Sequence, residues 1–286
     1  MLNFALLDDL PAARDAIARG RFDRPILRAT INDSEAARTL RARGYQVLAT
    51  ASGWEDPALR SADAFLDAGE LNEFDLSLIR STVVSDLLEL SGWDVVGDQL
   101  RSRYWSGLDQ LRTIARQHGD RPRFAFVHLP VPHAPIVFDQ DGRPVAVDLR
   151  TPFDYGAGLI DDEVIRSRYR AQLPYVDGTF LGALDDALAA LPDDAVVIVF
   201  SDHGPRSRLD ATDDLRLHEA VDAFFAARTP GRTSVFPATV TPVNVLPILF
   251  DSYFGTDLPR SEDRAWVSGE EELLPLIELP QPELAP

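Results

Sequence analysis

Residues 195–204 read AVVIVFSDHG, and this stretch decides the fold. Six apolar residues in a row, with no alternation of polar side chains, are typical of a central strand in a parallel sheet that is covered on both faces. The run follows the turn residues 192–194 and ends at the polar Ser201. Asp202 and His203 therefore come directly after the carboxyl end of a predicted strand, at the edge where open α/β sheets bind ligands.

Further strands and helices alternate along the chain. A second continuous apolar run, FAFVHL at residues 124–129, predicts another central parallel strand, and residues 45–50 and 223–227 are shorter candidates. Helical periodicity covers residues 35–43 (ending at Gly44), 71–90, 161–191 (with a predicted break near Pro174) and 242–254. Such alternation predicts a layered α/β fold.

The adjacent Asp202 and His203 can both reach one divalent cation, because a carboxylate supplies a hard oxygen and a neutral imidazole supplies a nitrogen. The alternative is that Asp202 caps the following segment and His203 is an ordinary surface residue. From their position in the sequence, the two interpretations are about equally supported. His218 is a candidate for a further ligand, although packing in a loop or edge strand is the simpler interpretation.

His133 lies in the segment HLPVPHAP at residues 128–135, again just after a predicted strand. Three prolines within six residues stiffen this loop and fix where His133 points. A positioned imidazole suits contact with an anion or proton transfer to a leaving group. Without further context, a turn residue with no chemical task is the simpler interpretation. His128, at the end of the apolar run, is best interpreted as a hydrogen-bonded core histidine.

Composition excludes several functions. The chain of 286 residues carries 46 acidic and 28 basic residues, for a net charge of −18. A surface of this charge repels phosphate backbones and argues against nucleic acid as a partner. The absence of cysteine excludes disulfides, thiolate metal sites and a cysteine nucleophile. Neither the glycine-flanked serine of α/β hydrolases nor a phosphate-binding glycine loop occurs.

Taken in order, these motifs resemble the sulfatase and alkaline phosphatase superfamily. The segment at residues 126–135 is similar to its PH.P strand and loop, residues 169–188 to its Y…yvD helix, and residues 197–204 to its SDHG corner. The likeness continues at residues 229–231, 242–244 and 253–259. It is greatest to membrane-anchored bacterial sulfatase-like proteins, a group that includes lipoteichoic-acid-synthase-like phosphoglycerol transferases. It implies a sulfatase-like catalytic domain over residues 1–268. The composition of residues 269–286, which is acidic and rich in proline, predicts a poorly ordered tail.

This resemblance implies an alkaline-phosphatase-like α/β fold, with a mostly parallel central sheet and helices on both faces. It also implies metal-dependent hydrolysis or transfer at a phosphate or sulfate ester. By analogy, Asp202 and His203 bind the divalent cation, which the sequence does not specify as Mn, Mg, Ca or Zn. His133 contacts the sulfate or phosphate group as a catalytic residue. Arg206 can clamp a substrate oxygen, although a surface arginine is the simpler interpretation.

One family feature has no counterpart in this sequence. The family's domain begins with a strand ending in a metal-binding acid, followed by a Thr, Ser or formylglycine nucleophile, and residues 1–9 match neither. The sequence therefore predicts a domain truncated at its N-terminus, with no nucleophile and with weak or no turnover. By resemblance, the parent protein carries N-terminal membrane helices and an extracytoplasmic catalytic domain, whereas the chain as written is soluble. The alternative is a non-catalytic remnant that serves as a binding or interaction module.

Overall fold

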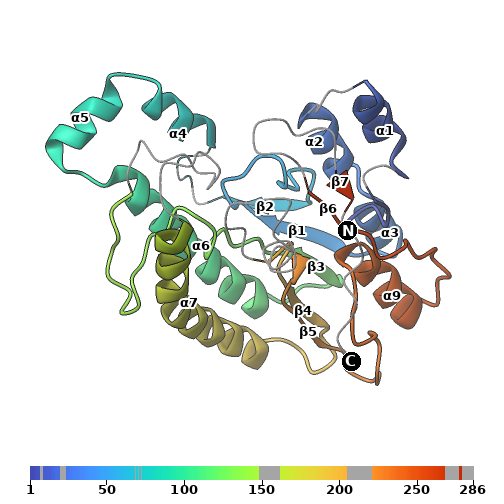
Figure 1. Cartoon of the computed structure of the whole chain (residues 1–286). Helices are drawn as coiled ribbons and strands as arrows, with labels where there is room; N and C mark the ends of the chain where they lie inside the picture. The colour runs from blue at the N-terminus through green and yellow to red at the C-terminus, as the bar shows by residue number, and fades with distance from the viewer. Residues whose placement is uncertain are drawn as a thin grey trace. The chain divides into compact units, whose positions relative to one another are not determined.

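A computed structural model describes residues 1–6, 9–19, 24–67, 69, 71, 73–147, 162–204, 221–267 and 277–278 (Figure 1). The chain divides into two compact units. One unit consists of Met1–Ala42 together with Pro192–Pro286, and the other consists of Arg43–Leu191. Each unit is described by itself.

The unit formed by Arg43–Leu191 contains a three-stranded parallel sheet. Its strands are β1 (Gln46–Thr50), β2 (Ala64–Leu66) and β3 (Arg123–Phe126), in the order β2-β1-β3. The central strand β1 aligns Leu48 with Ala64 on one side and with Ala125 on the other. Its last four residues are buried, as expected for a strand with neighbours on both sides.

The described residues of this unit also form the helices α4 (Glu73–Arg80), α5 (Val84–Ser91), α6 (Val95–Arg116) and α7 (Asp162–Ala190). Helix α6 begins after Asp94, whose carboxylate accepts a hydrogen bond of 3.1 Å from the Gly97 amide. This side chain satisfies one of the amide groups that the first helical turn leaves without a partner. Helices α6 and α7 pack side by side (Figure 1).

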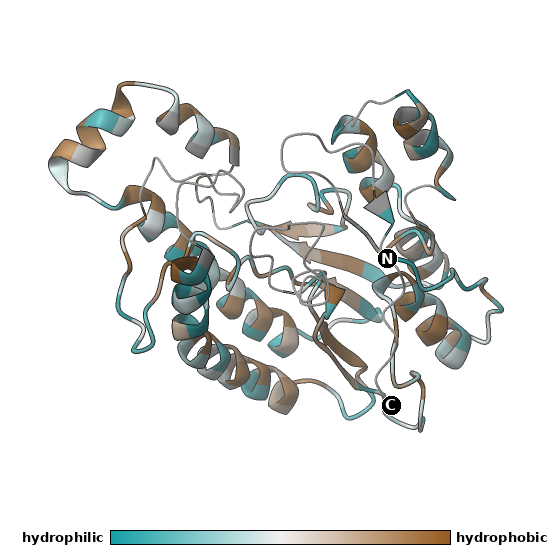
Figure 2. Ribbon diagram, in the orientation of Figure 1, coloured by the Kyte–Doolittle hydropathy of each residue, from teal (hydrophilic) through white to brown (hydrophobic). Residues whose placement is uncertain are grey.

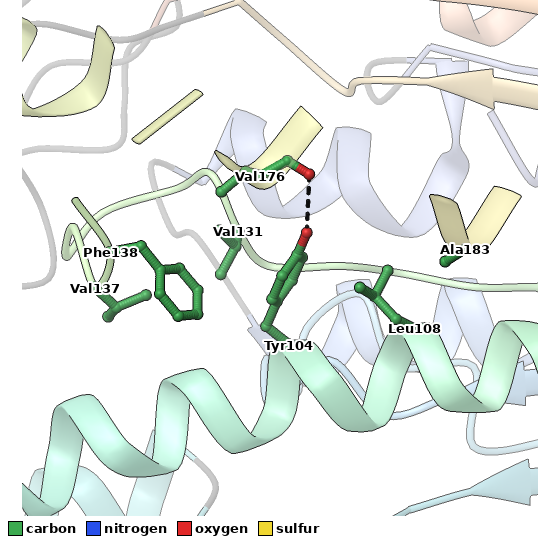
Figure 3. Close-up of a cluster of buried hydrophobic side chains, with 7 residues drawn as sticks. All are labelled: Tyr104, Leu108, Val131, Val137, Phe138, Val176 and Ala183. Atoms are coloured by element: carbon green, nitrogen blue, oxygen red, sulfur yellow. Dashed lines mark hydrogen bonds between the residues drawn. The ribbon is translucent and has the colours of Figure 1, made fainter. Parts of the chain in front are cut away.

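The core of this unit lies where α6, α7 and the segment after β3 meet (Figure 3). It consists of Tyr104, Leu108, Val131, Val137, Phe138, Val176 and Ala183. The Tyr104 hydroxyl donates to the Val176 carbonyl at 3.1 Å and lies 2.7 Å from the Thr179 hydroxyl. Burial raises the pKa of Tyr104 because a phenolate would be poorly solvated there. The segment after β3 is thus held against both helices.

Arg101 fastens α6 to that segment. Its buried guanidinium donates to the Val137 carbonyl at 3.2 Å and to the Val145 carbonyl at 3.1 Å. It also pairs with the carboxylates of Asp94 and Asp98, each at 2.7 Å. Burial alone would lower the pKa of Arg101, but these two carboxylates stabilise its charge and raise that pKa above its ordinary value.

The unit of Met1–Ala42 and Pro192–Pro286 contains two short antiparallel sheets and four described helices. The helices are α1 (Pro11–Ala18), α2 (Arg24–Asn32), α3 (Glu35–Ala42) and α9 (Pro242–Phe254). Strand β4 (Val197–Phe200) pairs with β5 (Phe225–Arg228), and β6 (Trp266–Val267) pairs with β7 (Ile277–Glu278). Strand β7 falls within the tail that the sequence predicts to be poorly ordered, so part of that tail is paired in a sheet.

Helix α9 ends in a capped turn. Gly255 adopts the left-handed conformation (φ 64°) that favours glycine, and its amide donates to the Asp251 carbonyl. The Asp251 carboxylate accepts from the Thr256 hydroxyl at 2.6 Å, the Leu258 amide at 3.0 Å and the Arg260 guanidinium at 2.6 Å. Burial alone would raise the pKa of Asp251, but these three donors stabilise the anion and hold that pKa below its ordinary value.

The predicted α/β class with a parallel sheet is confirmed, and so are the helices at residues 35–43 and 242–254, to within one residue. The interpretation of β4 as a central strand of a parallel sheet is wrong, because its partner β5 is antiparallel. The run at residues 124–129 does form a parallel strand, but the described sheet places β3 at its edge. The residues of β4 are half-buried and Ala125 of β3 is exposed, so neither run has the burial expected of a central strand. A continuous apolar run predicts a strand, but it does not determine the direction of the partner strand or the position in the sheet.

Two of the helices predicted from the sequence differ in the structure. Residues 71–90 form two helices rather than one, and the Ser81 and Thr82 hydroxyls bond the carbonyls of Leu78 and Ile79 at the break. Helix α7 continues through Pro174, where a break was predicted. A proline inside a helix costs about 3 kcal/mol, which the packing of α7 against α6 offsets. In the part of the chain described, no helix is long and apolar enough to cross a membrane.

Candidate functional site

The SDHG corner at residues 201–204 is held by backbone pairing beyond the end of β4. The Ser201 amide donates to the Phe224 carbonyl at 3.0 Å. In return, the Phe224 amide donates to the Ser201 hydroxyl at 2.8 Å. These two bonds extend the β4–β5 ladder by one residue pair, so the chain is fixed up to the point where Asp202 begins.

Asp202 and His203 lie next to each other at this corner. The His203 Nε2 is 3.7 Å from the Asp202 Oδ2, and the His203 Nδ1 is 2.6 Å from the Gly204 carbonyl oxygen. Because a carbonyl only accepts, Nδ1 carries the hydrogen in that contact. In the neutral ring, Nε2 then carries the lone pair, and it is the nitrogen on the carboxylate side. Histidines that bind metal commonly donate their other ring N–H in this way.

The spacing of the two donor atoms fits one shared cation. Two ligands about 2.1 Å from a tetrahedral ion are roughly 3.4 Å apart, close to the observed 3.7 Å. The Asp202 side chain is 79% exposed, so a small rotation can close the remaining difference. Among the described residues there is no group of three or more His, Cys, Asp or Glu side chains arranged to hold a metal. A cation held by this pair would need further ligands to complete its coordination shell.

His133 belongs to the other unit, where its loop is held from both ends. The His133 amide donates to the Pro130 carbonyl at 2.9 Å, which closes a turn. The Gln172 side chain, fully buried on α7, donates to the Pro132 carbonyl at 2.8 Å. The His133 Nδ1 lies 2.6 Å from the Ala134 carbonyl oxygen, so this ring has the same tautomer as His203. The stiff loop predicted from its prolines is thus also anchored by a helix.

Trp54 contacts the ring of His133. The two ring centroids are 5.4 Å apart and the ring planes are inclined by 70°, which is an edge-to-face arrangement. Trp54 follows the carboxyl end of β1, and its amide donates to the Ser52 hydroxyl at 3.3 Å. Because β1 and β3 are neighbouring strands of the parallel sheet, the segments that follow them place Trp54 and His133 at the same edge of that sheet. The indole limits the orientations that the imidazole can adopt.

The loop that carries Trp54 is itself fixed by Arg103 of α6. The buried Arg103 guanidinium donates to the carbonyls of Ser52 and Leu71. Gly53 stands against this guanidinium with φ +87°, a conformation that favours glycine, and a Cβ built there would overlap the Arg103 side chain. The tight turn after β1 therefore requires glycine at position 53, because a larger residue would overlap the Arg103 side chain.

Three other residues for which the sequence suggests a role are His128, Arg206 and His218. His128 is half-buried with its Nδ1 shielded from solvent, and its backbone amide donates to the Thr50 hydroxyl at 3.2 Å. The predicted hydrogen bond of its side chain stays a prediction. Arg206 and His218 lie outside the described residues. Sequence reasoning missed Trp54 and Gln172. The position of Trp54 four residues after a predicted strand was the one available signal for it, whereas nothing in the pattern of α7 distinguishes Gln172.

The fold is of the mixed α/β class, and a comparison with protein families agrees with it. Residues 102–229, a little under half of the chain, match the sequence model of the Sulfatase family. The matched region contains His133, Asp202, His203 and Arg206. It supports the sulfatase and alkaline phosphatase superfamily for this part of the chain, and the α/β architecture is consistent with an alkaline-phosphatase-like fold. Comparisons with curated proteins and with solved structures found no match.

Proposed function

We propose that this chain is a sulfatase-like, metal-dependent hydrolase or transferase that acts on a phosphate or sulfate ester. The observation that supports this most directly is the pairing of the Asp202 carboxylate with the Nε2 of His203 at 3.7 Å. A hydrogen bond from Nδ1 to the next carbonyl fixes the tautomer that metal binding requires. The family match spans these residues together with His133.

In this proposal, Asp202 and His203 bind a divalent cation, which is Mn, Mg, Ca or Zn. Such an ion, when bound, polarises the ester oxygens and stabilises negative charge. The ring of His133 is oriented by its bond to the Ala134 carbonyl and by the edge of Trp54. We assign its Nε2 to contact with the anionic group and to protonation of the leaving oxygen. Arg206 is assigned to clamp a substrate oxygen.

The family resemblance also extends to the parent protein. We propose that the catalytic region acts on the extracytoplasmic side of a bacterial membrane and that the parent protein is membrane-associated. No residue is assigned as the nucleophile, so the expected turnover of this chain is slow.

Metal binding tests the proposal. Mn²⁺, Mg²⁺, Ca²⁺ and Zn²⁺ are titrated separately into the purified chain by calorimetry. We expect Asp202→Asn and His203→Gln each to weaken binding of the preferred ion by at least about tenfold. Asp257→Asn, which changes another exposed carboxylate of the same unit, is the control and should leave the affinity unchanged. Equal binding by all four proteins, or no saturable binding, would contradict the assignment.

Hydrolysis of p-nitrophenyl phosphate and p-nitrocatechol sulfate separates the two candidate functions. For an enzyme, we expect slow, metal-dependent turnover that His133→Gln abolishes while the metal affinity stays unchanged. Metal binding without turnover of either ester would favour the alternative, a non-catalytic binding module. This assay also tests His133 independently of the metal pair, because the variant leaves Asp202 and His203 intact.

A further inference from the structure

Helices α4 and α5 expose an unusually apolar surface within twenty consecutive residues. Seven large apolar residues are between 42% and 85% exposed there: Phe74, Leu78, Val83, Val84, Leu87, Leu90 and Trp93. Figure 2 shows hydrophobic segments on both helices of this pair. The two helices contact each other, and we call these seven residues together the α4–α5 surface.

The apolar residues of each helix are spaced three or four positions apart, as on a helix face that packs against another element. Phe74 and Leu78 are four residues apart on α4, whereas Val84, Leu87 and Leu90 follow one another at steps of three along α5. Residues at such steps lie on one side of a helix. A stripe of this kind is normally turned toward a core, but here it is turned toward solvent.

The exposed area is large enough for a specific interface. With roughly 200 Å² for a fully exposed aromatic side chain and about 100 Å² for an aliphatic one, the seven residues expose roughly 600 Å² of apolar surface. This is the upper end of the largest patch on a typical monomer, about 300–600 Å². It is also most of the roughly 800 Å² that each partner contributes to a standard interface.

Charge argues against a lipid or nucleic-acid ligand. Residues 73–91 contain four acids and a single arginine, and the whole chain has a net charge of −18. Helices that bind anionic membranes carry a basic polar face, which this hairpin lacks. Asp86 is exposed in the first turn of α5, next to Leu87 in the sequence. Exposed apolar side chains with neighbouring acids suit contact with another protein more than contact with an anionic lipid surface.

We propose that the α4–α5 surface joins two copies of this chain in a two-fold symmetric dimer. A two-fold contact uses the same patch on both copies, so a single interface covers both exposed surfaces. The area available on each copy is close to what such an interface needs. Because each copy has a net charge of −18, the apolar contact drives association and electrostatic repulsion opposes it.

The salt dependence of association follows from this balance. Repulsion between the two acidic copies is screened within about 10 Å at 0.1 M salt. We therefore expect sedimentation equilibrium of the full chain to show a monomer–dimer equilibrium whose Kd falls when NaCl rises from about 50 mM to about 500 mM. An interface held by ion pairs would respond in the opposite direction. A monomer at both salt concentrations would overturn the proposal and leave a foreign partner with a basic rim as the occupant.

A matched pair of variants locates the contact. In the double variant Leu87→Gln with Leu90→Gln, we expect the dimer Kd to rise by at least about a hundredfold, since four leucines leave the interface. Glutamine keeps the helix propensity of leucine, and circular dichroism checks that the fold is retained. Leu181→Gln is the control, because Leu181 on α7 is 54% exposed against 59% for Leu87. Equal Kd values for the double variant and the control would refute the assignment.

Cross-linking provides a second measurement that does not depend on affinity. The chain has no cysteine, so a single Leu87→Cys substitution introduces a unique thiol. We place the two-fold axis near Leu87, in the middle of the α5 stripe, so that the two copies of position 87 lie near each other and mild oxidation should yield a disulfide-linked dimer. Leu181→Cys should stay monomeric on denaturing gels under the same conditions. If the two variants cross-link equally, the α4–α5 surface is not the interface.

Discussion

Replacing Arg101 by methionine removes a buried positive charge while roughly keeping the volume of the side chain. The Arg101 side chain is 8% exposed and donates to two carboxylates and two backbone carbonyls. In the variant, the Asp94 carboxylate, itself 19% exposed, loses its cation, and the carbonyls of Val137 and Val145 lose a donor. Asp98 is 73% exposed, so water replaces its partner at little cost.

The expected loss in the free energy of unfolding follows from how exposed the two aspartates are. Breaking a buried ion pair by removing one partner costs about 3–5 kcal/mol. Asp94 keeps its bonds from the amides of Gly97 and Val147, so we expect the lower part of this range, about 3–4 kcal/mol. Arg112→Met is the matched control, because Arg112 also lies on α6 and also pairs with two aspartates. Its partners are 51% and 76% exposed, so its loss should cost only about 0.5 kcal/mol.

Urea unfolding at pH 7, followed by circular dichroism, measures both variants. The free energy of unfolding is obtained from the midpoint and slope of each transition. An unchanged slope in both variants indicates that the difference arises in the folded state. If Arg101→Met lies within about 1 kcal/mol of Arg112→Met, the buried network does not stabilise the fold as reasoned here.

Three further changes test other parts of the fold. Tyr104→Phe removes the hydroxyl that bonds the carbonyl of α7, and we expect about 1–2 kcal/mol of destabilisation in the same urea assay. Gly53→Ala should cost about 3 kcal/mol because its Cβ overlaps the buried Arg103, whereas Gly44→Ala, at a similar φ but with nothing within 4 Å of its Cβ, should cost only about 1 kcal/mol. Asp251→Asn should lower the melting temperature at pH 7, and this difference should disappear at acid pH. The pKa of Asp251 is depressed in the folded state, so its contribution is full above the unfolded pKa of about 4 and is lost as the pH falls through the folded pKa.

The strands could be located from the sequence, but their partners could not. Apolar runs between turn residues predict β1, β3 and β4 to within about three residues, because a short apolar run bounded by turn residues is typical of a strand. The antiparallel pairing of β4 depends on where the chain returns after Ser201, which no local pattern encodes.

Two helical segments show that the spacing of apolar residues predicts a helix but does not determine the surroundings of its apolar face. Helix α6 was not singled out, although Val96, Leu100, Tyr104 and Leu108 repeat at every fourth residue. Arg101 and Arg103 interrupt this pattern with charges that are buried only because specific carbonyls and carboxylates surround them. The stripe on α4 and α5 was recognised as helical, but periodicity does not tell whether a stripe faces a core or solvent.

At the candidate site, the sequence placed Asp202 beside His203 because the two residues are adjacent. It could not predict which ring nitrogen of His203 bonds the Gly204 carbonyl, since that depends on backbone geometry at the corner. The contact between Trp54 and His133 joins residues almost eighty positions apart and follows from the strand order of the sheet. The metal-binding role of the pair and the role of Arg206 stay predictions.

The bond from Gln172 to the Pro132 carbonyl has an evolutionary consequence. It joins residues forty positions apart. The loop that carries His133 is therefore positioned by helix α7 and not by the segment that follows it in the chain. The next turn closes on itself, because the Asp139 amide bonds the Arg143 carbonyl and the Gly142 amide bonds the Asp139 carbonyl. We therefore expect that this outer turn can be lengthened or shortened while the imidazole of His133 keeps its place.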